Sequence, residues 1–223
     1  ELGTIGALNY LHAHQNRLVN PSLSNFPNLR GVNLDGNNLS ALEEVAKSLS
    51  KGVEWLSLND ASISDLSALN GLTALRSINA RRNAIQSLSL SDLPELHELR
   101  VQRSDVENVS FVNLPKLFNI DLGENKLSDL NELAQFMSNQ PSENGWSHVI
   151  QLYGNKIKDL GPFANLDRLG HVELQDNEIK DISPLADKNT IWYLNLQRNQ
   201  FSTVGDTFEQ YQSGARIELN GNI

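Results

Sequence analysis

Apolar residues recur along the whole chain in one pattern, written L-x-x-L-x-L-x-x-N-x-L, in which L stands for an aliphatic residue. The pattern occurs ten times in register, from residues 8–18 to an incomplete last copy at 214–223, with spacings of 21 to 30 residues. The alternation of apolar and polar positions in its middle predicts a short strand with one buried face. Repetition at this period predicts a solenoid whose repeats pack against their neighbours.

This pattern resembles the leucine-rich repeat family over almost the whole sequence. The resemblance implies an α/β repeat solenoid, a horseshoe with a concave parallel β-sheet of about ten strands. Its convex side would combine 3₁₀ turns, extended segments and two short helices. Neither end carries a polar cap of the kind that solenoids need, so we expect a fragment of a longer chain; the alternative is poorly capped end coils that dimerise or fray. For the chain by itself we expect a monomer. We treat residues 1–223 as a single domain.

The segments that return the chain to the sheet are of three kinds. Residues 65–75, 159–169 and 181–191 (DISPLADKNTI) resemble the return segments of bacterial internalins, which implies 3₁₀ turns. Residues 22–29, 89–96 and 110–117 predict extended segments, because apolar residues alternate there. Ser40 and Glu43 form a capping-box pattern that predicts a helix through Leu49. Residues 129–139 predict a second helix in an insertion near 128–146, followed by a loop over 141–145.

Position 9 of the pattern explains an unusual composition of 36 Leu and 27 Asn. An Asn buried at a turn can satisfy backbone groups of neighbouring coils, so we predict a structural ladder. Ser104 can replace Asn in part, whereas Ala61 cannot, and we therefore expect a weak point at Ala61. The ladder comprises Asn16, Asn37, Asn83, Asn125, Asn155, Asn177, Asn199 and Asn222.

Charge and cysteine content narrow the function classes. The net charge is −9 and the sequence pI is about 5.0, which argues against nucleic acid or an anionic membrane as the main partner. The absence of cysteine excludes disulfides, thiolate zinc sites and a cysteine nucleophile. No apolar run approaches the length of a membrane span, so we expect no membrane insertion.

Positions 3, 5, 7 and 8 of the pattern face outward on the predicted concave sheet. A basic island of Arg81, Arg82, Arg100 and Arg103 lies on two adjacent strands. It is either a patch for an acidic partner or a set of cross-strand ion pairs. In the second interpretation Arg82 pairs with Asp60, Arg103 with Glu124, Arg100 with Asp121, and Arg198 with Asp176, and Arg81 alone has no acidic neighbour in its column.

A strip of aromatic and aliphatic residues is the second feature of this face. Val149, Tyr153, His171 and Tyr193 lie on neighbouring strands beside Glu173. Exposed aromatic side chains on a rigid sheet are typical binding anchors. Trp55 and the group Tyr10, His12 and His14 are smaller candidates, and Trp146 and Trp192 are predicted to pack at the edge. The candidate contact residues are therefore Trp55, Arg81, Arg100, Arg103, Asp121, Tyr153, His171, Glu173 and Tyr193.

Catalytic and metal chemistry has little support in the sequence. His12 and His14 share a face near Asp35, but three firm ligands are not in evidence. His171 and Glu173 also share a face, but an open sheet gives them no pocket for acid–base work. No phosphate loop, G-x-S-x-G or H-E-x-x-H motif is present. We therefore expect no cofactor, no metal and no enzymatic activity.

The favoured hypothesis is a protein-binding scaffold, the recognition region of a larger bacterial surface or secreted protein. Internalin-like return segments favour it, although repeat lengths here vary more than in internalins. One alternative is a carbohydrate- or polymer-binding module of a larger enzyme, using Trp55, Tyr153, His171 and Tyr193. Another is a cytoplasmic regulator that docks on an enzyme, as phosphatase-regulating leucine-rich repeat proteins do. The partner is another protein in the first and third cases.

Overall fold

The computed structural model describes residues 5–141, 145 and 147–222. Contacts divide the chain into two compact units. Unit 1 consists of residues 1–105 and 110–117, and unit 2 of residues 106–109 and 118–223. Residues 142–144 and Trp146, in the predicted insertion, lie outside the described residues. That residues 1–223 act as one domain stays a prediction.

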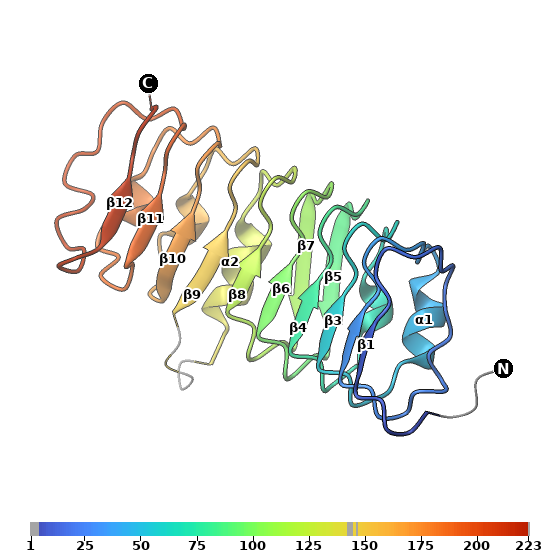
Figure 1. The fold of residues 1–223 in the computed structure, drawn as a ribbon. Helices are drawn as coiled ribbons and strands as arrows, with labels where there is room; N and C mark the ends of the chain where they lie inside the picture. Colours follow the sequence, from blue (N-terminus) through green and yellow to red (C-terminus); the bar gives the residue numbers. More distant parts are fainter. Residues whose placement is uncertain (1–4, 142–144, 146, 223) are drawn as a thin grey trace. The chain divides into compact units, whose positions relative to one another are not determined.

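Unit 1 contributes five short strands that pair in parallel, in the order of the chain (Figure 1). The register joins equivalent repeat positions: Leu11 lies opposite Val32, and Leu56 lies opposite Ile78. Each strand is only three residues long, because one polar–apolar–polar triplet per repeat meets the strand pattern. The strands are β1 (Tyr10–His12), β2 (Gly31–Asn33), β3 (Trp55–Ser57), β4 (Ser77–Asn79) and β6 (Glu98–Arg100).

Unit 2 contributes a further five strands that also pair in parallel and in chain order (yellow-green to red in Figure 1). A register shift between Leu169 and His171 interrupts the pairing of the third strand with the second. The strands are β8 (Asn119–Asp121), β9 (His148–Gln151), β10 (Leu169–Glu173), β11 (Tyr193–Asn195) and β12 (Arg216–Glu218). The prediction of about ten parallel strands is confirmed.

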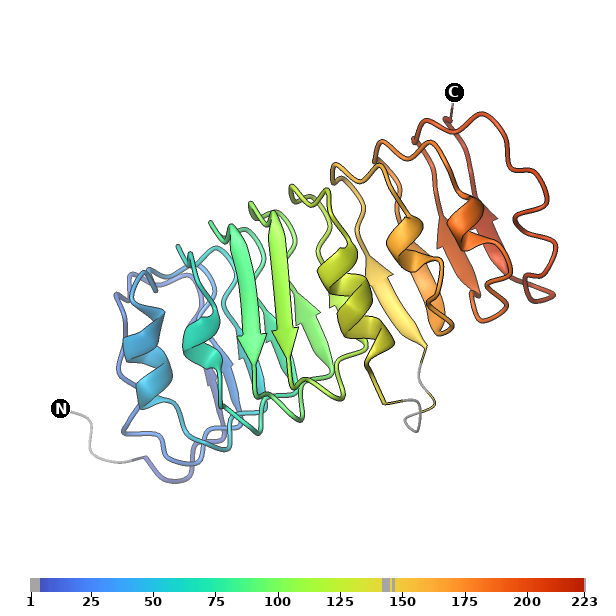
Figure 2. The same cartoon turned by 180° about the vertical axis from the view of Figure 1, so that it is seen from behind.

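The return segments cover the other side of each sheet (Figure 2). Three 3₁₀ turns occur in the segments that resemble internalin returns, as predicted: η1 (Ser67–Leu69), η3 (Gly161–Phe163) and η4 (Ser183–Leu185). Two extended segments, β5 (Ser87–Ser91) and β7 (Asn108–Val112), form a two-stranded sheet. The third predicted extended segment, residues 22–29, contains turns and no strand, and Leu23 there is buried.

Two helices complete the return side: α1 (Leu42–Ser48) and α2 (Asn131–Ser138). Both were predicted, but the capping box at Ser40 was wrong. The N-cap of α1 is Ala41, which has no side chain able to accept a hydrogen bond, and no side-chain cap is formed. The N–H of Ala41 instead donates to Oδ1 of Asn20, 2.9 Å away. A contact with the preceding repeat therefore sets the start of this helix.

Aliphatic side chains from the pattern fill the interior. Positions 1, 4, 6 and 11 of the second repeat are Leu29, Val32, Leu34 and Leu39, and all four are fully buried. Burying one such side chain stabilises the fold by about 1.5–3 kcal/mol. Since each repeat supplies the same layer, the core continues through successive coils of each unit.

Position 8 adopts the left-handed backbone conformation in all ten repeats, with φ between 51° and 79°. Only three of these residues are glycines, although a side chain at positive φ costs about 1–2 kcal/mol. The chain takes this conformation three residues after each strand of the ten-stranded sheet ends, directly before position 9, whose Asn is buried in six of the repeats. The residues are Gln15, Gly36, Asp60, Arg82, Arg103, Glu124, Gly154, Asp176, Arg198 and Gly221.

The position 9 amides bond to the backbone of their own coil and of the coil before. Asn177 is typical: its Nδ2 donates to the carbonyls of Leu174 and Leu152, 3.0 Å away. Its Oδ1 accepts the N–H of Ile157 at 3.0 Å. Because Asn177 is buried, these backbone groups have no water to bond instead. Asn37, Asn83, Asn155 and Asn199 bond in the same way.

At Ala61, where the sequence predicts a weak point, neighbouring groups form the hydrogen bonds that an Asn side chain would form. The N–H of Leu39, which an Asn at position 61 would bond, donates to the Ala61 carbonyl at 2.8 Å. The Leu34 carbonyl accepts Nδ2 of Asn37 at 2.9 Å. Asn83 accepts the N–H groups of both Ala61 and Ile63 at 3.0 Å. Backbone and neighbouring amides therefore bond the groups that an Asn at position 61 would bond, and the local weak point expected at Ala61 stays a prediction.

Candidate functional site

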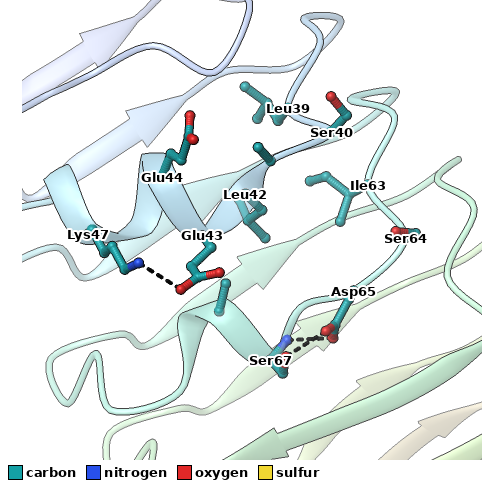
Figure 3. A pocket seen from close by; sticks show the side chains of 12 residues that line it. Leu39, Ser40, Leu42, Glu43, Glu44, Lys47, Ile63, Ser64, Asp65 and Ser67 are labelled. Carbon is teal, nitrogen blue, oxygen red and sulfur yellow. Dashed lines mark hydrogen bonds and ion pairs between the residues drawn. The ribbon is translucent and has the colours of Figure 1, made fainter.

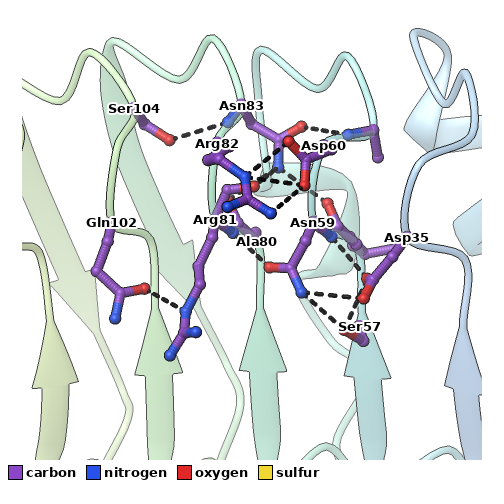
Figure 4. A network of polar contacts seen from close by, with 12 residues as sticks. Asp35, Ser57, Asn59, Asp60, Ala80, Arg81, Arg82, Asn83, Gln102 and Ser104 are labelled. Carbon is purple, nitrogen blue, oxygen red and sulfur yellow. Dashed lines mark hydrogen bonds and ion pairs between the residues drawn. The ribbon is translucent and has the colours of Figure 1, made fainter.

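The face of unit 1 carries a chain of polar contacts that runs across successive repeats (Figure 4). Oδ1 of Asp35 accepts the Ser57 hydroxyl at 2.7 Å and the N–H of Asn59 at 2.8 Å. Oδ1 of Asn59 accepts the N–H of Arg81 at 2.8 Å. The Arg81 side chain continues the chain, because its Nε donates to Oε1 of Gln102 at 2.7 Å. Arg81 is therefore tied to its neighbours through an amide and not through a carboxylate.

The remaining arginines of the basic island mostly pair with acids. Arg82 donates to both carboxylate oxygens of Asp60, with a shortest distance of 2.7 Å, as the column arrangement predicted (Figure 4). Arg100 pairs with Glu98 of its own strand at 2.5 Å. Arg103 is exposed at position 8. In unit 2, Arg198 pairs with Asp176 at 2.5 Å, again as predicted.

Asp121 is the candidate that the structure places least favourably for contact. It lies at the end of β8, and only 4% of it is exposed. Its Oδ1 accepts the N–H of Gly123 at 3.2 Å. We assign Asp121 to holding this turn, since little of its carboxylate reaches solvent.

A cluster of rings forms on the face of unit 2. The imidazole of His171 stacks on the ring of Tyr193, with 4.4 Å between centroids and 23° between planes. The indole of Trp192 meets the same imidazole edge-on, with centroids 5.0 Å apart. Trp192 is 51% exposed, so it contributes a large apolar surface to the cluster. We call His171, Trp192 and Tyr193 the ring cluster.

Two carboxylates accompany the ring cluster, one on each side of Tyr193. Nε2 of His171 lies 2.7 Å from Oε1 of Glu173 on the same strand. Arg216 pairs with Glu218 at 2.5 Å, and its guanidinium lies 5.8 Å from the centroid of the Tyr193 ring. Since His171 is on β10 and Arg216 on β12, a cationic or ionisable group flanks the Tyr193 ring from each neighbouring strand.

Glycines make room for several of the exposed rings. A Cβ added to Gly123 would lie 2.3 Å from the Tyr153 ring, and one added to Gly170 would lie 2.9 Å from Nε1 of Trp192. Both distances are shorter than van der Waals contact allows. These rings therefore lie against the sheet and occupy the space that a side chain would need.

Unit 1 has a smaller aromatic group around Gly31. A Cβ on Gly31 would lie 2.6 Å from the Tyr10 ring and 3.3 Å from the Trp55 ring. Trp55 also faces His12, with ring centroids 6.3 Å apart. Tyr10 is 63% exposed, which makes it the most open ring of this group.

The return side of unit 1 holds a groove of about 590 Å³ between α1 and η1 (Figure 3). Two of the charged side chains that line it pair with each other: Lys47 bonds Glu43 at 2.7 Å. Asp65 accepts both the N–H and the hydroxyl of Ser67, at 2.8 and 2.6 Å.

Metal and membrane features are absent from the described part of the chain. Three or more His, Cys, Asp or Glu side chains able to hold a metal do not come together there. Among those same residues, no helix has the length and apolar character needed to cross a bilayer.

Sequence reasoning identified His171, Glu173 and Tyr193 in unit 2 and missed three residues that contact them. Trp192 was assigned to edge packing, yet it is half exposed and contacts His171. The amides Gln151 and Gln175 both bond Glu173. These two contacts could have been predicted from the repeat positions. Gln151 is at position 5 and Gln175 at position 7, and both positions place the amide next to Glu173 on the same face of the sheet.

Comparison with known proteins supports the fold alone. No protein-family profile and no curated protein sequence match this chain. Among solved structures, an internalin (InlF) from Listeria monocytogenes is 22% identical, with a TM-score of 0.59 over 97% of this chain and 74% of that one. Internalin C2 from the same organism is 23% identical, with a TM-score of 0.59 over 85% and 76%.

A third match is the LRIM1/APL1C complex, with 19% identity and a TM-score of 0.75 over 98% of this chain and 40% of that one. Other matched structures are described as leucine-rich repeat domains. The parallel strands, the short return segments and these matches agree. The chain has the leucine-rich repeat fold, and internalins are among the proteins that share it.

Proposed function

We propose that this chain is a non-catalytic scaffold for protein–protein interaction and that the strand face makes the contact. The proposed contact residues in unit 2 are Tyr153, His171, Glu173 and Tyr193, together with Trp192. In unit 1 they are Trp55, Arg81, Arg100 and Arg103. The proposal extends to its setting, the recognition region of a larger bacterial surface or secreted protein.

The observation that carries the proposal is the ring cluster. His171 and Tyr193 lie on short strands, whose backbones are held by hydrogen bonds to both neighbours. Trp192 directly precedes β11, and its N–H donates to the Gly170 carbonyl at 2.9 Å. An aromatic side chain on such a backbone loses little conformational entropy when a partner covers it. A half-exposed Trp192 next to the stacked His171 and Tyr193 is therefore suited to anchor a protein partner.

The matched structures support the same class of function by analogy. The structure with the highest TM-score of those described above is that of a complex, LRIM1 with APL1C. The two internalins come from a bacterium, which supports the proposed bacterial setting. Analogy at the level of the fold favours an interaction role, and the argument for a site rests on the residues of this chain.

Carbohydrate binding is less well supported in unit 2. A sugar ring stacks on an open aromatic face. The Tyr193 ring instead has His171 of β10 stacked on it, and Arg216 of β12 lies near it from the other neighbouring strand. A neutral sugar would also provide no cationic group to pair with the carboxylate of Glu173. The more open Tyr10 of unit 1 would be the better sugar platform.

Site-specific photo-crosslinking tests the proposal. A benzophenone amino acid replaces Tyr193 in one variant and Gln135, an exposed residue of α2 on the return side of the same unit, in the control. Both are illuminated with extracts and secreted fractions from candidate bacterial and host cells. We expect a crosslinked protein from position 193 and not from position 135. Capture from position 135 alone would move the contact to the return side and contradict the proposal.

A further inference from the structure

The carboxylate of Glu173 is held in one orientation without being neutralised by a permanent cation. Its Oε1 accepts from Nε2 of Gln151 at 3.2 Å, and its Oε2 accepts from Nε2 of Gln175 at 3.1 Å. The third contact is His171, 2.7 Å from Oε1, which is charged only when protonated. Among the described residues, no Lys or Arg pairs with Glu173.

The chain contains a comparison for this arrangement two strands away. On β12, Arg216 at position 3 pairs with Glu218 at position 5, and the guanidinium lies over the Tyr193 ring. On β10, His171 and Glu173 occupy the same two positions on the other side of Tyr193. The carboxylate of β12 therefore has an arginine of its own, and the carboxylate of β10 has only an imidazole and two neutral amides.

Partial burial makes this difference important. The Glu173 side chain is 19% exposed, so it is largely shielded from water but still partly accessible. Charge–charge attraction is stronger at such a site than at a fully hydrated one. The two amides also fix the carboxylate, so a cationic partner would not have to immobilise it.

The distribution of charge favours the same sign of partner. Unit 1 contains 10 Lys and Arg against 11 Asp and Glu, whereas unit 2 contains 8 against 16. Nearly all of the net charge of −9 therefore belongs to the unit that carries Glu173. A field of this sign attracts a cationic partner and steers it towards unit 2.

We propose that the face of β9–β12 binds a Lys- or Arg-containing segment of a protein, and that one cationic side chain of this segment pairs with Glu173. The inference rests on the proposed protein-binding function and adds the chemistry of the partner. The exposed Trp192 provides apolar contact beside the charged contact, and Gln151, Gln175 and His171 position the carboxylate.

Binding of synthetic peptides tests this inference. Fluorescent 12-residue peptides carry Lys or Arg at alternate positions, with Gln or Glu replacing the basic residues in the two comparison peptides. Fluorescence anisotropy is measured with the full chain at low and at physiological salt. We expect binding of the basic peptides, weakened by salt, and no binding of the Gln or Glu peptides. Failure of the basic peptides to bind at low salt would overturn the inference.

Variants separate the site from the general charge. We expect Glu173→Gln to weaken binding about tenfold, since it keeps the shape and removes the charge. Glu132→Gln in α2, on the return side, removes the same charge and should stay within about twofold. Equal losses in both variants would show general attraction to an acidic unit and would overturn the inference.

A second substitution keeps Glu173 and gives its carboxylate a permanent cationic partner on the same strand. His171→Arg copies the Arg216–Glu218 pair onto β10, and we expect it to weaken the basic peptides as Glu173→Gln does. Circular dichroism and urea unfolding check that both variants fold. Unchanged binding by folded His171→Arg would contradict the proposed pairing.

The photo-crosslink at position 193 distinguishes the two proposals. Capture that is lost when Glu173→Gln is added supports both. Capture that persists in this double variant would leave the protein-binding function standing and overturn the cationic segment. Binding of a neutral glycan that depends on Glu173 would overturn the peptide class.

Discussion

The ring of Tyr153 lies over the backbone of Gly123 on the neighbouring repeat, so close that an added Cβ would be 2.3 Å from the ring. Trp192 has the same relationship with Gly170. In each pair a glycine of one repeat provides the space for an aromatic residue of the next. The orientation of these exposed rings is thus decided by the absence of a side chain beneath them.

Replacing this glycine should therefore move the ring. We expect Gly123→Ala to displace Tyr153 from the sheet, with a stability loss of only about 1 kcal/mol because the Tyr153 side chain is only partly buried. The chain has four tyrosines, so aromatic NMR signals can identify the one that shifts. Gly6→Ala is the control, since its added Cβ meets no atom within 4 Å. An unshifted Tyr153 signal in Gly123→Ala would contradict the proposed packing of the Tyr153 ring on Gly123.

The asparagine ladder predicts unequal costs for equal substitutions. Asn83 bonds the Leu58 and Ala80 carbonyls at 2.9 Å and accepts two N–H groups. We expect Asn83→Ala to lower the free energy of unfolding by about 3 kcal/mol, because buried backbone groups lose their partners. Asn16 is exposed and bonds only nearby carbonyls, so Asn16→Ala should cost less than about 1 kcal/mol. Urea unfolding of the two variants measures the difference, and similar midpoints would argue against the ladder.

The buried His148 predicts a loss of stability in mild acid. Burial is the main cause that lowers its pKa from 6.5 to about 4, with a smaller effect of the positive Arg168. Below pH 6.5 the unfolded chain takes up a proton on this residue and the folded chain does not. The unfolded state is therefore favoured progressively down to about pH 4, by roughly 3 kcal/mol in total.

His148→Leu removes this titration and keeps an apolar interior. We expect the difference in unfolding free energy between wild type and His148→Leu to change between pH 7 and pH 5 in favour of the variant. His14→Gln is the control, because His14 is exposed. If wild type and His148→Leu lost stability in parallel over this range, His148 would not be the buried titrating group.

The start of α1 offers a stabilising substitution. Ala41 is the N-cap and forms no side-chain cap. Ala41→Ser should raise the unfolding free energy by about 0.5–1 kcal/mol, because a hydroxyl can accept a hydrogen bond from the first turn. Ser40→Ala should change it by less than about 0.5 kcal/mol, since Ser40 is exposed and lies outside the cap. A large loss in Ser40→Ala would restore the capping box that the sequence suggested.

The side-chain pairs between equivalent repeat positions show most clearly which contacts can be predicted from the sequence. The Arg82–Asp60 and Arg198–Asp176 pairs follow from column neighbours, because parallel strands in register bring equal positions together. The same logic places His171 beside Tyr193. It fails for Arg100, which pairs with Glu98 along its own strand, because a long side chain can choose between neighbours.

By itself the sequence determined the repeat, the strand positions, the apolar layers and the asparagine column, because each depends on a local period that recurs in every coil. Only the tertiary structure decided how exposed side chains share hydrogen bonds and space. Three contacts join residues of different coils: the packing of Tyr153 on Gly123, the backbone bond from Leu39 to Ala61, and the bond from Gln151 that orients Glu173. Such contacts depend on rotamers and on the left-handed turn at position 8, neither of which a pattern of apolar residues specifies.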